Sequence, residues 1–529
     1  MTQPPVKQIE SSTPRPSGAR KVASRVDAVL QAKTLLTPSM PVGGWRRFLA
    51  DSATAGGATI FGQVLGAGTA ILLRMLLSPI QIGIWQGLKL ALSYGNYAGL
   101  GVSKAAAREV SLASGQQAAP QLSRSINLAF TVNTLTSLGY ALILVAVATV
   151  VTWGQSELAT EWSVGFIAIA ALAMLQRYTT FRVTLLRANH RVRATSLLAL
   201  QESVLTVLTT GICVWLWGLV GLYTATALVM ISSLWFLQRR REHQFQFAWD
   251  GAEVRRLMKI GAPLLAAGIV SSLFRSMDKL FVLATIADGE FQLGCYSTAL
   301  LVSIQIYGLA NVFSGVCGPR LTQAVGVNRN STSVAALAAR FMEMISVVLS
   351  LPAAIAVCFA PPLLMSFLPE YQAGLPALIP TVCGALALGL SLPAQHCLVA
   401  WNRGRGVLGA MVAGTVLAFF LNGIAVATGG GVLRIAIATA LANLAYLSLV
   451  LSMTMRAVPR AELVKQLIAT GVALIPCGLA MLLSMNTPGM SWGQATLASG
   501  ICLLVWLLII VCGWNRFRWS EFLTRGASN

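Results

Sequence analysis

Six basic residues lie inside, or at the margins of, long apolar stretches of the sequence, where a charge needs a partner. A Lys or Arg at the centre of a membrane-spanning helix costs about 2.5–3.5 kcal/mol of insertion free energy. Such a side chain must extend to the interface, pair with a carboxylate or face a water-filled cavity. A cation in a cavity can bind an anion, and the planar fork of arginine suits bidentate contact with phosphate. The six residues are Arg74, Lys89, Arg177, Arg275, Lys279 and Arg434.

Lys89 begins a polar face on its apolar stretch. Ser93, Asn96 and Tyr97 follow it by four, seven and eight residues, a spacing that places side chains on one face of a helix. We therefore expect Lys89, Asn96 and Tyr97 to line a cavity and bind substrate. The alternative is that Lys89 extends its long stem to the membrane interface.

A second group of charges lies in the first long apolar stretch of the second half of the chain. Arg275 is predicted to present its guanidinium to a phosphate in the same cavity. Asp278 follows Arg275 by three residues, so the alternative is a local ion pair on one helix. Asp278 is also a candidate for coupling transport to an ion.

Polar residues in other stretches complete the candidate site. Arg177 is a candidate substrate ligand, and Glu202 is a candidate proton- or cation-coupled carboxylate. The competing interpretation pairs these two residues with each other. Tyr307 and Asn311 are further binding candidates, unless they are hydrogen-bonding groups between helices.

The elements that carry these residues are predicted to be membrane-spanning helices. The chain has 529 residues, of which 56% are hydrophobic and only 10% charged, whereas soluble domains average about 25% charged residues. About 20 apolar residues in a helix cross the hydrocarbon core. We predict an all-α polytopic membrane protein with about 14 transmembrane helices. The predicted spans are 54–78, 82–103, 126–153, 163–181, 194–216, 219–237, 260–284, 291–318, 341–367, 376–400, 407–427, 432–454, 466–485 and 492–514.

The loop charges predict the orientation of these spans. All but the six basic residues named above, of 38 in total, fall in the two tails or in alternate gaps. The other gaps lack Lys and Arg but contain acidic residues such as Glu161, Asp288 and Glu290. By the positive-inside rule, both termini are expected in the cytoplasm of a bacterial cell, with the protein in the inner membrane. This placement also excludes nucleic acid as a partner, although the net charge is +21.

The chain contains an internal repeat. Gly83–Trp85 and Gly294–Tyr296 open equivalent spans about 211 residues apart, and the preceding spans end near Arg74 and Lys279. An even number of spans separates them, so we predict two parallel six-helix lobes followed by two extra helices. The predicted domains are a disordered basic cytoplasmic tail (1–53), an N-terminal lobe (54–237), a cytoplasmic linker (238–259), a C-terminal lobe (260–454) and the extra helices with a short tail (455–529).

The motifs of soluble enzymes and metal sites do not occur in the sequence. The nine cysteines include no C-x-x-C pair, and neither a phosphate-binding P-loop nor H-E-x-x-H occurs. No predicted outward gap is long enough to form a catalytic domain. We therefore expect no enzyme activity, no cofactor and no metal.

Two junctions resemble those of one transporter family. Arg74–Trp85, with the polar helix that runs to Gly99–Lys104, resembles the first junction of Wzx-like polysaccharide flippases, which belong to the multidrug, oligosaccharidyl-lipid and polysaccharide exporter superfamily. Asp278–Val282 with Gly294–Ser297 resembles the matching junction in their second half. The first junction usually reads more like Gly-Pro-Glu-Glu, and here it is Ser78-Pro-Ile-Gln81.

The resemblance implies a flippase for an oligosaccharide linked to undecaprenyl pyrophosphate, working by alternating access around a central cationic cavity. It also implies the lipid bilayer, a polysaccharide polymerase and assembly proteins as partners. Three alternatives remain: a multidrug or cation antiporter of the same superfamily, a flippase for a peptidoglycan precursor lipid, and a membrane glycan polymerase or glycosyltransferase. The antiporter would favour an acidic cavity, whereas the basic candidates here outnumber the acidic ones.

Overall fold

The described part of the protein is helical. The computed structural model describes residues 42–116, 119–153, 158–188, 191–239, 245–327, 331–456, 458, 460–487 and 489–517. The chain divides into two compact units, Met1–Thr54 and Ala55–Asn529. In the first unit, the predicted tail lies outside the described residues up to residue 41, and the remainder is the beginning of helix α2.

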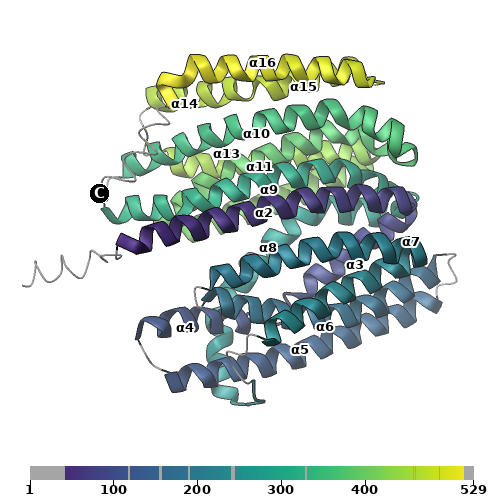
Figure 1. The fold of residues 1–529 in the computed structure, drawn as a ribbon, viewed down its shortest axis with the longest axis vertical. Helices are drawn as coiled ribbons and strands as arrows, with labels where there is room; N and C mark the ends of the chain where they lie inside the picture. Colours follow the sequence, from purple (N-terminus) through teal and green to yellow (C-terminus); the bar gives the residue numbers. More distant parts are fainter. Residues whose placement is uncertain are drawn as a thin grey trace, which may run out of the picture. The chain divides into compact units, whose positions relative to one another are not determined.

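The helices follow the predicted spans along the chain (Figure 1). Those of the first half are α2 (Val42–Leu76), α3 (Pro79–Gly95), α4 (Val102–Gln116), α5 (Ala119–Trp153), α6 (Ala159–Ala188) and α7 (Val192–Arg239). Those of the second half are α8 (Gly251–Thr285), α9 (Gly289–Val327), α10 (Ser331–Phe367), the 3-10 helix η1 (Pro369–Ala377), α11 (Leu378–Ala400), α12 (Gly404–Ala427) and α13 (Val432–Met455). The last three are α14 (Arg460–Ala473), α15 (Ile475–Asn486) and α16 (Trp492–Phe517).

The prediction of an all-α polytopic membrane protein is confirmed. Within the described residues, 11 helices are long and apolar enough to cross a membrane, or up to 12 if the pair α14 and α15, bent by 45°, forms one span. Helix α7 accounts for two predicted spans, because Gly218 breaks it with a φ of 55°. Helix α3 is shorter, with 17 residues. Each predicted span thus corresponds to a helix, to half of α7 or to the bent pair.

The predicted span 82–103 contains a break that its sequence did not predict. Helix α3 ends at Gly95, and a turn with positive φ at Leu100 and Gly101 leads into α4. A Cβ atom on Gly101 would overlap the backbone of Gly261 in α8, and a Cβ atom on Gly261 would overlap Gly101 in turn. Glycine is therefore needed at both positions, because the two backbones touch.

Two large apolar clusters form the core. Helices α3, α5, α6 and α7 surround the first, which includes Ile84, Leu88 and Ile169 and also takes in Leu364 and Tyr371 from the second half of the chain. Helices α9, α10, α11 and α13 surround a second cluster, and α15 and α16 pack against α10 and join that cluster through Cys477 and Cys502. Helix α8 contacts α4 and α5 at its beginning and α12 and α13 later, so it is shared between the halves.

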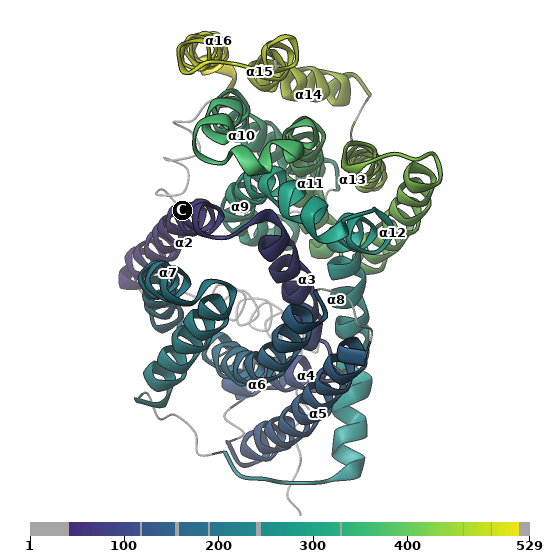
Figure 2. The same ribbon diagram turned by 90° about the vertical axis from the view of Figure 1, so that its right-hand side faces the viewer.

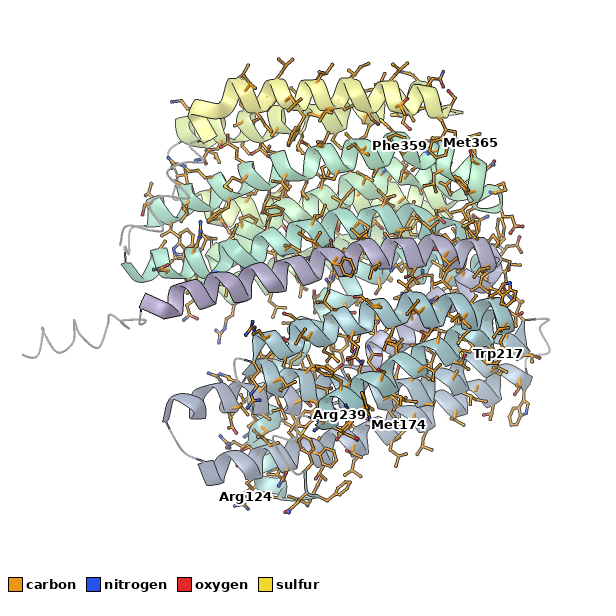
Figure 3. All side chains as sticks on the ribbon, in the orientation of Figure 1. Arg124, Met174, Trp217, Arg239, Phe359 and Met365 are labelled. Carbon is orange, nitrogen blue, oxygen red and sulfur yellow. The ribbon has the colours of Figure 1, made fainter. Side chains whose placement is uncertain are left out.

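The helix ends define two sides of the bundle. We call the end that carries Lys104, Arg124 and Arg256 the basic side, and the end with the turns after α2, α8 and α10 the opposite side. Figure 3 shows Arg124 and Trp217 at these two ends of the helices. On the basic side, Arg124 pairs with Asp250, and Arg256 pairs with Glu109 and Glu253.

Candidate functional site

Helix α3 carries Lys89 between the two halves of the chain. A capping box starts this helix: the Ser78 hydroxyl accepts from the Gln81 backbone N–H, and the Gln81 side chain accepts from the Ser78 N–H. Ser78 and Gln81 can therefore cap the helix at the junction where the sequence reads Ser-Pro-Ile-Gln instead of Gly-Pro-Glu-Glu. Helix α3 packs against α6, α8 and α9, as Figure 2 shows.

Lys89 is exposed on an otherwise enclosed helix. Within α3, only Ile80 near its start and Lys89 are exposed. The Lys89 ammonium lies 5.9 Å from the ring centre of Trp85, one turn earlier on the same helix. Lys89 is therefore an exposed cation on a helix that packs against α6 of the first half and against α8 and α9 of the second.

Two more cations act on Lys89. The charged groups with the strongest electrostatic influence on its ammonium are Lys279 of α8 and Arg74 of α2. Both are positive, and within the described residues no carboxylate forms an ion pair with any of the three. We call Arg74, Lys89 and Lys279 the basic triad. Three cations without an ion-pair partner outnumber the one carboxylate next to them in sequence, Asp278, and can therefore form a site for an anion.

Arg74 also bonds the two halves together. Its Nε donates to the Thr298 hydroxyl at 3.0 Å, and its Nη2 donates to the carbonyl and hydroxyl of Ser297 at 2.9 and 2.8 Å. Its Nη1 donates to the Ala70 carbonyl at 2.8 Å. The side chain is only 6% exposed, so these neutral acceptors replace water around a buried cation.

The sequence candidates did not include Arg74 or Lys279 among the binding residues. Both lie in the spans before the repeated glycine junctions, Arg74 ahead of Gly83 and Lys279 ahead of Gly294. That shared place was the available signal, because junctions related by a repeat come close to the axis between the lobes.

Asp278 and Arg275 do not pair. The buried Asp278 carboxylate accepts from the Tyr296 hydroxyl at 2.6 Å and from the Lys279 backbone N–H at 2.8 Å. Arg275 is exposed, and its Nε donates to the Ser271 carbonyl at 3.2 Å. The Asp278 carboxylate, next to Lys279 in the sequence, therefore accepts two hydrogen bonds. Within the described residues it forms no ion pair.

Arg177 lies inside the N-terminal half. It is 3% exposed, and its Nη2 donates to Asn133 Oδ1 at 2.9 Å and to Thr136 Oγ1 at 2.8 Å. Nη2 also lies against Gly99 in the turn between α3 and α4. Arg177 therefore contacts the turn between α3 and α4 and helps to hold the backbone in place where α3 ends.

Glu202 does not pair with Arg177 either. Its Oε1 accepts from the Ser233 hydroxyl at 2.7 Å, which joins the two halves of α7 across the break at Gly218. Glu202 is partly buried, and its partner can remain in place whether the carboxyl group carries a charge or a proton.

The four remaining candidates lie on α9 and around the end of α3. Asn96 is exposed, seven residues after Lys89, while Tyr97 lies beneath the Lys104 ammonium, 5.6 Å from its ring centre. On α9, Asn311 is exposed and its Nδ2 donates to the Tyr307 carbonyl at 3.0 Å. The structure gives none of these four a contact with the triad.

A seal joins the halves on the opposite side. A Cβ atom on Gly83 of α3 would overlap the Glu290 carbonyl of α9, and a Cβ atom on Gly294 would overlap the Pro79 carbonyl. Gly83 and Gly294 are separated by 211 residues, as are Pro79 and Glu290. The two contacts are therefore the same contact made twice, once from each repeat.

Side chains reinforce this seal. Trp162 Nε1 donates to Glu290 Oε1 at 3.1 Å, which links α6 to α9. The Tyr371 hydroxyl of η1 donates to the Leu77 carbonyl at 2.7 Å, just beyond the end of α2. With the bonds of Arg74, three separate connections hold the lobes together beside the glycine crossing.

The arrangement is suited to binding and moving an anion. Arg74 bonds across the two halves, Lys279 and Arg74 act electrostatically on Lys89, and contacts close one side. Among the described residues, no group of three or more His, Cys, Asp or Glu side chains forms a metal site. The alternation of two closed ends around such a site would carry an anionic group across the membrane.

Comparison with sequence families finds one match. Residues 48–325 match a family whose description is polysaccharide biosynthesis protein. No curated protein matches the sequence.

Solved structures share the fold at low sequence identity. The lipid II flippase MurJ, in an inward closed conformation, aligns with a TM-score of 0.64 and 16% identity over 88% of this chain and 99% of its own. An inward-facing multidrug resistance MATE transporter of the MOP superfamily aligns with a TM-score of 0.57 and 17% identity over 76% and 94%. A MOP superfamily transporter from Pyrococcus furiosus aligns with a TM-score of 0.55 and 16% identity over 77% and 95%. At this identity the similarity establishes the fold alone.

Proposed function

Because the chain belongs to the polysaccharide biosynthesis protein family, we propose that it is a flippase for an oligosaccharide linked to undecaprenyl pyrophosphate. The family match and the transporter fold support movement of a glycan lipid in preference to catalysis. The single observation that carries the proposal is the basic triad: Arg74 bonds across the two halves, Lys89 is exposed on α3, and neither they nor Lys279 form an ion pair within the described residues.

The chemistry of such a substrate fits the triad. A pyrophosphate cannot enter hydrocarbon without counter-charges, and cations in a partly dehydrated site supply them. Lys89 and Lys279 come from different halves of the chain, so a bound pyrophosphate would contact both lobes. Arg275, Asn96, Tyr97, Tyr307 and Asn311 are proposed to contact the sugar or lipid parts.

Two carboxylates are proposed to couple transport to an ion. Glu202 and Asp278 are each bonded to a hydroxyl donor, from Ser233 and Tyr296 respectively. A proton on either carboxyl group would change its hydrogen bonds without removing the partner. We propose that the basic side faces the bacterial cytoplasm, with both termini there, and that a polysaccharide polymerase acts on the product.

Flipping of a defined lipid tests the proposal. The protein is reconstituted in vesicles of phosphatidylethanolamine and phosphatidylglycerol, and the initial rate is measured with a fluorescent sugar on undecaprenyl pyrophosphate. Lys89→Ala and Lys279→Ala should each lower the rate by about tenfold or more, since a bond to a charged group contributes about 1.5–3 kcal/mol. Lys259→Ala removes an exposed lysine from the same helix as Lys279 and should keep the parent rate.

Other substrates define the contrary outcomes. Parent-like flipping by both variants would contradict the cationic site. Export of organic cations in place of the lipid would instead support the antiporter alternative. A higher rate with lipid II than with the oligosaccharide lipid would identify a peptidoglycan precursor as the substrate.

A further inference from the structure

Arg74 takes part in two arrangements at once. It is one of the three cations of the basic triad, and it is also a bond between α2 and α9 within the seal. No other member of the triad has a hydrogen bond from its side chain to the opposite lobe within the described residues. A change at the anion site can therefore reach the seal through this one side chain.

The present partners of Arg74 are all neutral. Thr298 offers a hydroxyl, Ser297 a hydroxyl and a carbonyl, and Ala70 a carbonyl. A phosphate offers a full negative charge and two oxygens in the plane of the guanidinium. In a partly dehydrated site, an anion attracts the guanidinium more strongly than these dipoles do.

We propose that Arg74 is a latch that the pyrophosphate of the substrate releases. The inference rests on the proposed function and deepens it. When the anion binds at Lys89 and Lys279, Arg74 turns towards it and leaves Ser297 and Thr298. The seal on the opposite side then loses the bond between α2 and α9.

The rest of the seal can yield once this bond is gone. At the crossing of α3 and α9 the backbones meet at Gly83 and Gly294, which have no side chains of their own. At these two points the helices can pivot without a change of rotamer. The Tyr371 bond to Leu77 lies three residues beyond Arg74, so movement of the end of α2 also strains that connection.

A distance across the opposite side reports the state of the seal. Thr160 and Gly431 are exposed there, one in each half, and neither contacts the triad. Thr160→Cys and Gly431→Cys carry spin labels in a full-length protein whose nine native cysteines are replaced. The probe is geranylgeranyl pyrophosphate in vesicles of phosphatidylethanolamine and phosphatidylglycerol, and geranylgeraniol, which lacks the phosphates, is its control.

The expected results separate the two roles of Arg74. In the parent, the pyrophosphate probe should shift the label distances to longer values, whereas geranylgeraniol should not. Ser297→Ala with Thr298→Val removes the hydroxyl acceptors, so it should lengthen the distances without probe and tighten probe binding, because the anion no longer competes with these bonds for Arg74. Arg74→Gln should lengthen the distances as well, and it should also weaken probe binding by about tenfold or more.

Arg74→Lys is the control for misfolding of Arg74→Gln. It keeps the positive charge but lacks the planar guanidinium group, so it should weaken the bonds to Ser297 and Thr298 and retain more probe binding than Arg74→Gln. Two results would contradict the latch: probe binding by Arg74→Gln as tight as that of the parent, or label distances in the parent that do not change when the probe is added. Lys89→Ala and Lys279→Ala are measured in the same assay. If these two variants lose probe binding, a contrary result for Arg74 contradicts only the latch. If they bind the probe normally, the proposed function is contradicted as well.

Discussion

Two buried arginines show how differently one residue type can serve within a membrane. Arg74 bonds to the other lobe and belongs to the triad, whereas Arg177 bonds within its own half, to Asn133 and Thr136. The sequence suggested the same substrate role for Arg177 as for Lys89. Its contacts favour a supporting role under the turn after α3, and the assignment can be tested.

Arg177→Met should destabilise the protein. The change leaves Asn133 Oδ1 and Thr136 Oγ1 without their donor, which should cost about 1–3 kcal/mol of unfolding free energy. Thermal unfolding in detergent measures the loss. Arg187→Met, at an exposed position on the same helix, should remain near the parent. Normal stability combined with lost flipping would instead assign Arg177 to the substrate.

The candidate site was only partly predictable from individual residues. Helical periodicity placed Lys89 and Asn96 on one face, because residues along one helix have fixed relative positions. It did not reveal that Lys279, rather than Arg275, acts on Lys89, since that depends on how α3 and α8 meet. The alternative, a local pair of Asp278 with Arg275, is not formed, because the Tyr296 hydroxyl of α9 donates to the Asp278 carboxylate.

At the scale of elements, the crossing of α3 and α9 positions the triad. The two helices approach until backbone meets backbone, which only glycine permits at the points of contact. The crossing therefore sets the position of Lys89 along α3 relative to Lys279 on α8. The sequence signalled the crossing by repeating Gly83 as Gly294, but not that the two glycines lie at one crossing.

Gly83→Ala and Gly294→Ala should each damage the seal. The added methyl group would overlap the backbone of the other helix, and overpacking of this kind costs about 1–3 kcal/mol. Both thermal stability and flipping rate should fall. Gly68→Ala is the matched control, because no atom lies within 4 Å of its added Cβ. Equal tolerance of all three changes would contradict the close crossing.

At the scale of the whole molecule, composition and hydropathy predicted most of the fold. The apolar stretches predicted the membrane helices. The resemblance agrees with the family match, which places the chain among the polysaccharide biosynthesis proteins, and with the fold shared with solved transporters. One of the two breaks was harder to predict. The predicted spans 194–216 and 219–237 end on either side of Gly218, whereas the turn at Leu100 falls inside the predicted span 82–103 and was missed.

The proposed orientation can be tested with two glycines at opposite ends of α12. Gly404 lies on the basic side and Gly431 just beyond the other end, and both have open space around an added side chain. In intact cells with Cys512 replaced by Ser, a membrane-impermeant thiol reagent should modify Gly431→Cys. Gly404→Cys should react only after the membrane is permeabilised, because its loop carries Arg403 and Arg405. The reverse pattern would place the termini outside.

The repeated glycine contact has one more consequence, which concerns the direction in which a ligand lies. A crossing made twice by equivalent residues has no preferred direction of its own. The triad does have one: at the 211-residue separation of the two glycines, the counterparts of Arg74, Lys89 and Lys279 are Thr285, Leu300 and Gly68, which carry no charge. Two of the cations therefore come from the first repeat and one from the second. Because the charges are distributed asymmetrically over two equivalent repeats, a pyrophosphate would bind in one orientation. Its lipid end and its sugar end would then face different parts of the protein.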